Sequence, residues 1–268
     1  MTRVARALAF HELLERGRDR WVLVSSLLFA ALASAVSAYG KEAAEAGGGA
    51  ATLTGPSLVT LASLFVPLVA LVLSHDAIVG ERERNTLGLL LSLPVSRFEV
   101  VLSKLLGRGV ALTLAVCLGL GAAMALSSEG QRGTLAELLG PTLLLGLAFL
   151  SIGVLISSLS GRQTVAASVV VVVWFGLVFF YDLGLLGVLV ISDGAISQQV
   201  VADLVVANPA GLYRVAMMEA FVGPNALADL GLVAELPGPA ARFGIWAAWI
   251  LGPAVLSGIL LSTRKVLR

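Results

Sequence analysis

The sequence predicts an all-α membrane protein with six transmembrane helices. Of its 268 residues, 58% are hydrophobic and only 13% are charged, and the mean hydropathy is +0.96. A typical soluble domain carries about 25% charged residues. Several separate apolar runs are long enough to cross a bilayer as helices. Lysines and arginines gather in alternate connections between these runs. These three observations argue against a soluble globular enzyme.

Residues 1–20 are predicted to be a cytoplasmic segment at the membrane interface. Arg3 and Arg6 are followed by acids and further arginines before the first apolar run begins at Trp21. That run starts too late and is too long for the core of a signal peptide. We therefore expect no cleavable leader.

The first three predicted spans differ little in composition. Residues 21–39 and residues 57–74 contain no charge, over 19 and 18 positions. The third span, residues 105–126, is interrupted only by Arg108 near its start. Each is long enough for a helix that crosses the hydrocarbon core, which is about 30 Å thick.

The last three predicted spans each have a local feature. Residues 141–160 begin with a proline, which suits the first turn of a helix. Residues 164–181 form the fifth span, and the apolar residues 183–191 after it are too few to cross alone, so they predict an extension or a re-entrant piece. Residues 243–262 form the sixth span, in which Pro253 predicts a kink.

The distribution of basic residues predicts that both termini are cytoplasmic. Fourteen of the eighteen lysines and arginines fall in the N-terminal segment, in the connection between spans two and three with its flanks, at residue 162, or in the tail, residues 263–268. The remaining four are Lys41, Arg132, Arg214 and Arg242. Cytoplasmic loops retain positive charge. With both termini on the same side of the membrane the number of spans must be even, and six spans satisfy this condition.

Small residues recur four apart on two of the spans. Such ridges let helices pack closely in lipid. They are Ser26, Ala30, Ser34 and Ala38 on the first span, and Ala111, Ala115, Gly119 and Ala123 on the third.

The sequence carries no pattern typical of a catalytic or metal site. The two histidines, His11 and His75, are far apart and Cys117 is the only cysteine, so neither a metal-ligand cluster nor an intrachain disulfide is expected. No acid lies near the middle of a clear span, and no phosphate-binding loop is present. The net charge of +1 argues against nucleic-acid binding. We expect no directly bound cofactor, and any ATP hydrolysis must come from another subunit.

The connection between spans two and three, residues 75–104, is predicted to be ordered as helix, break, helix. The charged residues 81–84 extend the second span, and the apolar residues 86–93 are too short to cross and too hydrophobic to remain in water. Pro94 ends that segment, and Ser96 with Glu99 forms a capping box for the next helix. The alternative is an interfacial helix that lies on lipid.

A longer motif in this connection resembles a known family. The run Glu81-Arg82-Glu83-x-x-Thr86-Leu87-x-Leu89-Leu90-Leu91-Ser92-x-Pro94-Val95-Ser96-Arg97, followed by Lys104, is similar to the first cytoplasmic loop of ABC-2 type transporter permeases. In that family the loop forms a coupling helix that docks on an ATP-binding subunit. The resemblance covers essentially the whole chain and implies a multi-pass inner-membrane permease, of the ABC-2 (type V exporter-like) fold.

The resemblance also implies partners and roles. We expect a permease dimer joined to two ABC ATPase subunits, which bind ATP and Mg²⁺. In this interpretation polar contacts with the ATPase come from Glu81, Arg82 and Glu83, and its groove is filled by Leu87, Leu90 and Leu91. The loop is held near anionic lipid by Arg97 and Lys104. Thr86 and Pro94 complete the predicted coupling residues. Closure of the ATPases would move this loop, and spans two and three would transmit the shift outward.

Two further stretches resemble a subgroup of these permeases. Residues 68–71 leading into residues 75–81, and residues 207–209 followed by residues 212–214, are similar to permeases that serve maturation of the copper centre of nitrous oxide reductase. This resemblance implies an outer copper-handling β-helix protein as a partner. The alternatives are a general ABC exporter of lipid, drug or peptide, and a membrane anchor or receptor without energy coupling.

The outer connection, residues 182–241, is predicted to fold into short helices that dock such a partner. It has six acids and one base, and Ile196, Val200 and Leu204 form an apolar stripe at helical spacing. The expected partner-binding residues are Asp203, Asn208, Pro209, Tyr213 and Arg214. The alternative is a lid that packs against its own bundle.

Overall fold

The computed structural model describes residues 3–17, 20–45, 54–127, 129–192, 195–222 and 236–263, and within these residues every regular element is a helix. This confirms the predicted all-α class. The elements are α1 (Arg3–Gly17), α2 (Arg20–Glu45), α3 (Thr54–Ser74), α4 (Val79–Glu83), α5 (Leu87–Ser92), α6 (Arg97–Leu126), α7 (Glu129–Glu137), α8 (Leu139–Leu159), α9 (Gln163–Phe175), the π-helix η2 (Gly176–Phe180), α10 (Tyr181–Ile191), α11 (Gln198–Ala207), α12 (Pro209–Val222) and α14 (Pro239–Thr263).

The long helices agree with the predicted spans. Among the described residues, five helical stretches are long and apolar enough to cross a membrane, and the bent pair formed by α11 and α12 would make a sixth if it counts as one span. The five are Gly55–Glu83, Arg97–Leu126, Leu135–Leu159, Gln163–Ile191 and Pro239–Thr263. Each contains one predicted span, to within a residue at its ends. The first predicted run, residues 21–39, lies inside the 26-residue helix α2.

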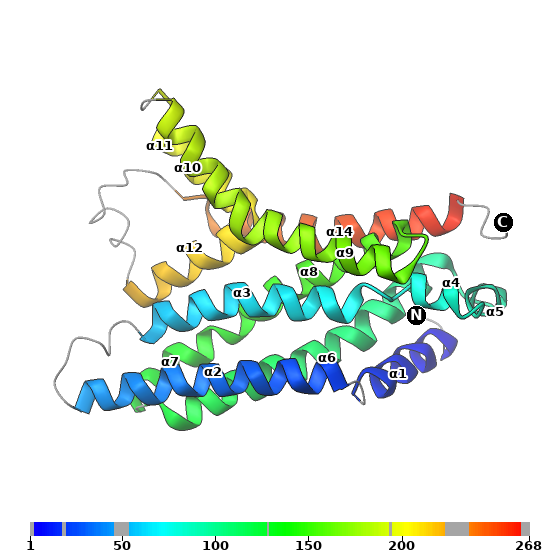
Figure 1. Cartoon of the computed structure of the whole chain (residues 1–268), viewed down its shortest axis with the longest axis horizontal. Coiled ribbons are helices and arrows are strands. Elements are labelled where there is room, and N and C mark those ends of the chain that lie inside the picture. Colours follow the sequence, from blue (N-terminus) through cyan, green and yellow to red (C-terminus); the bar gives the residue numbers. More distant parts are fainter. Residues whose placement is uncertain are drawn as a thin grey trace.

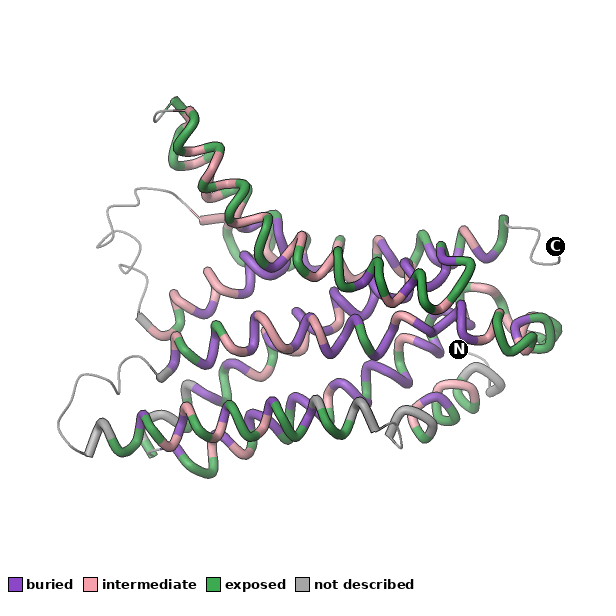
Figure 2. Tube along the Cα trace, in the orientation of Figure 1, coloured by how far each residue is buried: buried purple, intermediate pink, exposed green. Residues whose placement is uncertain are grey.

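Helix α8 lies at the centre of the bundle. It packs against α3, α6 and α14, and it contains no charged residue. A helix that is apolar all round is a buried helix, and 72% of the apolar part of Leu135–Leu159 is indeed buried. Figure 2 shows the buried residues running along α3 and α8 in the middle of the bundle. Gly153 allows the closest approach, because a Cβ there would lie 1.9 Å from Ser74 Oγ on α3.

Helices α2 and α6 lie side by side (Figure 1). The small-residue ridge predicted on α6 is confirmed, because Ala111, Ala115, Gly119 and Ala123 are all buried. A Cβ at Gly119 would lie 2.2 Å from a ring carbon of Phe29 on α2. The ridge predicted on α2 is only partly correct. Among the residues of α2 whose burial the structure describes, the buried ones are Ser26, Phe29, Ala33, Ser37 and Gly40. Here Phe29 fills the hollow above Gly119, and Ala30, Ser34 and Ala38 are half-buried beside it.

The predicted outer connection begins on one long helix. Helix α9 continues through η2 into α10 as a single stretch, Gln163–Ile191. Residues 183–191 are therefore an extension of the fifth span, one of the two predicted possibilities. Helices α11 and α12 meet at a bend of 110°. Helix α12 packs against α3 and α8, so this half of the predicted outer connection belongs to the bundle, as the lid alternative holds.

The short helices gather at one end of the bundle. Helices α1, α4 and α5 lie at the same end as the last turns of α14 (Figure 1). α1 packs against the first turns of α6, as the contact between Gly107 and the backbone of Ala9 shows. This arrangement places the N-terminal segment beside the connection predicted to carry the function.

Candidate functional site

The connecting segment, which we define as residues 75–96, has the predicted order of helix, break and helix. A turn at residues 75–78 leads into α4, and α5 follows after Thr86. Asn85 makes the break, because its φ of +58° lies in the left-handed region that asparagine tolerates. The extended backbone of Leu93, before Pro94, ends α5 as predicted. Asn85 was not among the predicted coupling residues.

The capping box at the end of this segment is confirmed. The Ser96 hydroxyl accepts a hydrogen bond from the backbone N–H of Glu99 at 3.1 Å. The Glu99 carboxylate in turn accepts from the backbone N–H of Ser96, also at 3.1 Å. These two bonds fix where α6 begins, and so they fix the exit of the connecting segment.

Helix α4 is attached to the end of α8 and the start of α9 by hydrogen bonds. Each of these bonds pairs a free backbone group at the end of a helix with a side chain of another helix. Its own N-cap residue, Ile78, offers no side-chain cap. Instead Ser157 of α8 accepts hydrogen bonds from the backbone N–H groups of Ile78 at 2.9 Å and Val79 at 3.1 Å. In the opposite direction, the Glu83 carboxylate accepts from the backbone N–H of Gln163 at 2.8 Å, at the start of α9. Arg82 donates to the carbonyl of Ser160, at the end of α8.

These contacts change the expectation for two predicted polar residues. Arg82 and Glu83 were expected to contact an ATPase, but the structure uses them to hold α4 on its own bundle. Free N–H groups at a helix start and free carbonyls at a helix end need partners. Ser157 and Gln163 are 74 or more residues away from α4 in the chain, so no local pattern in the sequence could have predicted these contacts.

A buried ionic cluster joins α1, α6 and the start of the connecting segment. We define it as Glu12, Asp76, Glu81, Lys104 and Arg108. Lys104 Nζ lies 2.6 Å from a carboxylate oxygen of Glu12 and 2.6 Å from one of Glu81. Arg108 Nε lies 2.7 Å from the other oxygen of Glu12, and Arg108 Nη1 lies 2.6 Å from Asp76.

The cluster is well shielded from solvent and holds its parts together. Arg108 is only 1% exposed and Glu12 only 2%. Removing one partner of a buried ion pair costs about 3–5 kcal/mol, because the other charge is left unpaired. The expected role of Lys104 is therefore corrected: its ammonium group binds two carboxylates inside the protein and does not reach lipid headgroups. Glu12 and Arg108 were not predicted as site residues.

The leucines of α5 face in two directions. Leu87 is 2% exposed and packs in a small core with Ile78, Val101, Val154 and Leu261, so the expectation that it fills a partner's groove is wrong. Leu90 and Leu91 are half-buried against the same core. Leu89, in contrast, is 70% exposed. The residues of α5 and its exit that remain on the surface, which we call the outer face of α5, are Gly88, Leu89, Ser92, Leu93 and Pro94.

Two other predicted residues, Thr86 and Arg97, hold the connecting segment together, and a third, Pro94, lies on its surface. Thr86 donates its hydroxyl to the Glu81 carboxylate, across the break made by Asn85. Arg97 donates to the backbone carbonyl of Leu91 at 3.2 Å, near the end of α5. Both bonds hold α5 in place against the segments on either side of it. Pro94 remains exposed.

Most of the predicted outer residues are buried, which corrects the expectation that they bind a partner. Tyr213 is fully buried and its hydroxyl lies 3.0 Å from the Thr142 hydroxyl. Asn208 is 1% exposed and donates to the backbone carbonyl of Leu177 at 2.7 Å. Pro209 is buried as well. These residues sit where α12 enters the bundle, and the apolar surroundings that bury them come from distant segments.

Of the last two predicted outer residues, Arg214 is half-buried and Asp203 is exposed. Arg214 pairs with Asp182 at 2.5 Å, which links α12 to α10. Asp203 is exposed on α11 and accepts a hydrogen bond from Gln199 at 3.1 Å, a contact within one helix face. Of the five predicted residues, only Asp203 therefore belongs to an open surface.

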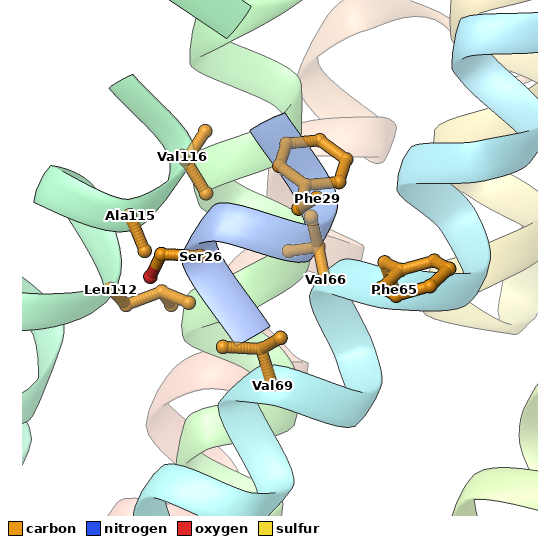
Figure 3. Close-up of a pocket in the computed structure, with 8 residues that line it drawn as sticks. All are labelled: Ser26, Phe29, Phe65, Val66, Val69, Leu112, Ala115 and Val116. Atoms are coloured by element: carbon orange, nitrogen blue, oxygen red, sulfur yellow. The ribbon is translucent and has the colours of Figure 1, made fainter. Parts of the chain in front are cut away.

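One further feature of the interior is almost entirely apolar. A small groove lies between α2, α3 and α6, where Ser26 is the only polar side chain among residues such as Phe29 and Phe65 (Figure 3). Across the part of the chain that the structure describes, no three His, Cys, Asp or Glu side chains come together in a way that holds a metal ion. Among the described residues, the charged side chains that are buried, Glu12, Asp76, Lys104 and Arg108, all belong to the ionic cluster.

Comparison with known proteins gives a consistent result. The sequence model of a family described as ABC-2 family transporter protein matches residues 6–266. The chain is 37% identical over 253 residues to a "Probable ABC transporter permease protein NosY" of Pseudomonas aeruginosa, with 91% of each chain covered. It is also 37% identical over 270 residues to the protein of the same name from Stutzerimonas stutzeri, with 97% of this chain and 98% of that one covered.

Proposed function

The chain belongs to the ABC-2 family of transporter proteins as a multi-pass membrane permease subunit, and from that premise we propose that it couples ATP hydrolysis by a separate ABC ATPase subunit to an event on the outer side of the membrane. In this proposal the chain has no catalytic site of its own. ATP and Mg²⁺ bind in the ATPase, which is of the NosF type. A second copy of the chain completes the membrane-spanning part.

The observation that carries the proposal is the contrast between the two sides of α5. Its inner side, with Leu87 at 2% exposure, is anchored in the bundle, and its outer face presents Leu89 at 70% exposure. An apolar side chain on a rigid, anchored helix suits a groove in a partner protein. The bonds of α4 to the turn between α8 and α9 supply the mechanical attachment that coupling requires.

For the outer event, we propose maturation of the copper centre of nitrous oxide reductase. The similarity to permeases named NosY over nearly the full length of both chains supports this choice. The partner on that side would be a copper-handling β-helix protein of the NosD type. Its contact surface is the exposed side of α11, which includes Asp203, rather than the buried residues Asn208, Pro209 and Tyr213.

Co-purification tests both parts of the proposal. An epitope on the C-terminus retrieves the intact complex from membranes, and mass spectrometry identifies its subunits. We expect an ABC ATPase and an outer β-helix protein, together with a copper-dependent defect of nitrous oxide reductase when the permease is deleted. An ATPase without the β-helix protein, with hydrolysis stimulated by a lipid, drug or peptide, would support a general exporter instead. Absence of any ATPase would refute coupling.

A further inference from the structure

The inner end of α9 is tied to the connecting segment. Glu83 of α4 accepts a hydrogen bond from the backbone N–H of Gln163, the first residue of α9, at 2.8 Å. Neither α9 nor its N-cap residue, Arg162, supplies a side-chain cap for this end. The cap of α9 therefore comes from α4. When α4 moves, the start of α9 either follows it or loses its cap.

The helix that begins at Gln163 runs without interruption to the outer side. It covers 29 residues through η2 to Ile191, which at about 1.5 Å per residue is roughly 40 Å. Only 11% of its apolar part is buried, compared with 61% for Gly55–Glu83 and 44% for Arg97–Leu126. Of the five candidate spans, it is the one least fixed by packing within the chain. It can therefore shift with the smallest loss of internal contacts.

The outer part of this helix is tied to the bend between α11 and α12. The Asn208 side chain, at the 110° bend, donates to the carbonyl of Leu177 in η2 at 2.7 Å. The Tyr181 hydroxyl, at the start of α10, donates to the carbonyl of Leu204 in α11 at 2.6 Å. The same Asn208 side chain accepts from the backbone N–H of Ala210 at 3.1 Å and so shapes the entry to α12.

We propose that α9, η2 and α10 act as one continuous helix that transmits the movement of α4 to the bend between α11 and α12. Glu83 is the positioning residue at its inner end, and Asn208 and Tyr181 are the positioning residues at its outer end. This proposal rests on the proposed function and names the route within it. It replaces the predicted route through spans two and three, since α3 and α6 are more deeply packed and share the buried ionic cluster at their inner ends.

The route is tested by measuring a distance on the outer side while nucleotide is trapped by the ATPase. Cys117 is the only cysteine and is exposed, so a Cys117→Ser background allows Lys41→Cys on α2 and Val200→Cys on α11 to carry paired spin labels. The permease is purified with its ATPase subunit and reconstituted in lipid. The distance is compared with and without ATP plus vanadate, at equal amounts of trapped nucleotide.

Two pairs of variants separate transmission from folding. At the inner end, Glu83→Ala removes the acceptor for Gln163, whereas Glu83→Gln keeps an acceptor oxygen. Glu137→Ala, at an exposed position on α7, is the matched control. At the outer end, Tyr181→Phe removes one hydroxyl, and Tyr39→Phe on the exposed side of α2 is its control. We expect the nucleotide-dependent distance change to be lost in Glu83→Ala and Tyr181→Phe, and kept in Glu83→Gln and both controls.

The outcomes distinguish this inference from the proposed function. A wild-type distance change in both Glu83→Ala and Tyr181→Phe would overturn the route through α9 and leave coupling intact. Loss of the change in Glu83→Gln as well would show that the hydrogen bond to Gln163 is not what transmits the movement, and would also overturn it. If even the wild-type distance does not respond to trapped nucleotide, the proposed function itself fails.

Discussion

Glu12 and Lys104 lie 92 positions apart in the chain, and their charged groups approach to 2.6 Å inside the bundle. The same ammonium group lies 2.6 Å from Glu81. Lys104 therefore joins three elements: α1, its own helix α6, and α4. Charges of this kind are expensive to bury, and they are tolerated only when each one is paired. The N-terminal helix and the connecting segment are held together at their base by this side chain and by Arg108, which pairs with Glu12 and Asp76.

Removal of the Lys104 charge is predicted to destabilise the protein strongly. In Lys104→Met, Glu81 loses its cation and Glu12 keeps only Arg108, and breaking a buried ion pair by removing one partner costs about 3–5 kcal/mol. The measurement is the thermal unfolding midpoint of the purified permease in detergent. Lys41→Met, at an exposed site on α2, is the control, and Lys104→Arg should retain most of the stability. Equal midpoints for Lys104→Met and the wild type would contradict the ionic cluster.

Close packing of α3 and α8 gives a second prediction. In Gly153→Ala the new Cβ would lie 1.9 Å from Ser74 Oγ, whose position is fixed by a hydrogen bond to Ala70 at 2.6 Å. Overpacking of a core typically costs about 1–3 kcal/mol. Gly140→Ala on the same helix meets no atom within 4 Å and should be neutral or stabilising.

The same unfolding measurement checks this pair. Adding Ser74→Gly to Gly153→Ala removes the clashing side chain, so the double variant should regain part of the lost stability. If Gly153→Ala and Gly140→Ala unfold at the same temperature, α3 and α8 do not approach as closely as described.

Features set by neighbouring residues were predictable from the sequence. The capping box of Ser96 and Glu99, the end of α5 before Pro94, and the small-residue ridge of α6 all depend on patterns within a few turns of one helix. The order of apolar runs predicted the positions of the long helices for the same reason. Each of these expectations is confirmed by the structure.

Features set by distant contacts were not predictable. Leu87 and Leu89 look alike in the sequence, and only the core formed with Val154 and Leu261 buries one and leaves the other exposed. Ser157 caps α4 from 79 positions away. Asn208 lies in a stretch that resembles a subgroup of these permeases, but that resemblance does not show whether its amide faces a partner or the bundle. The spacing of apolar residues shows which face of a helix is apolar, but it does not show which segment or partner covers that face.

The capping box provides a milder, local prediction. Ser96→Ala removes the acceptor for the Glu99 N–H at the start of α6. Loss of an N-cap side chain costs about 1 kcal/mol. Ser92→Ala, four residues earlier at an exposed position, removes a hydroxyl that donates to Leu89 and serves as control. We expect Ser96→Ala to unfold at a lower temperature than Ser92→Ala. The reverse order would argue against the cap.

The two faces of α5 lead to opposite expectations for neighbouring leucines. Leu89→Asp changes a side chain that is 70% exposed, so the permease alone should unfold at the wild-type temperature. Leu87→Asp places a carboxylate without a partner in the core and should unfold the protein or greatly reduce its yield.

Binding to the ATPase subunit then shows whether the outer face of α5 is the docking surface. A central apolar anchor contributes about 2 kcal/mol or more to an interface, which is roughly a thirtyfold change in Kd. Leu89→Asp should therefore weaken association by at least that factor in a titration of the purified ATPase against the permease in nanodiscs. Leu118→Asn, on an exposed part of α6 remote from α5, controls for a general effect of polar substitution. Undiminished affinity of the Leu89→Asp permease would mean that the ATPase binds elsewhere, since no other side chain within α5 is both large, apolar and mostly exposed.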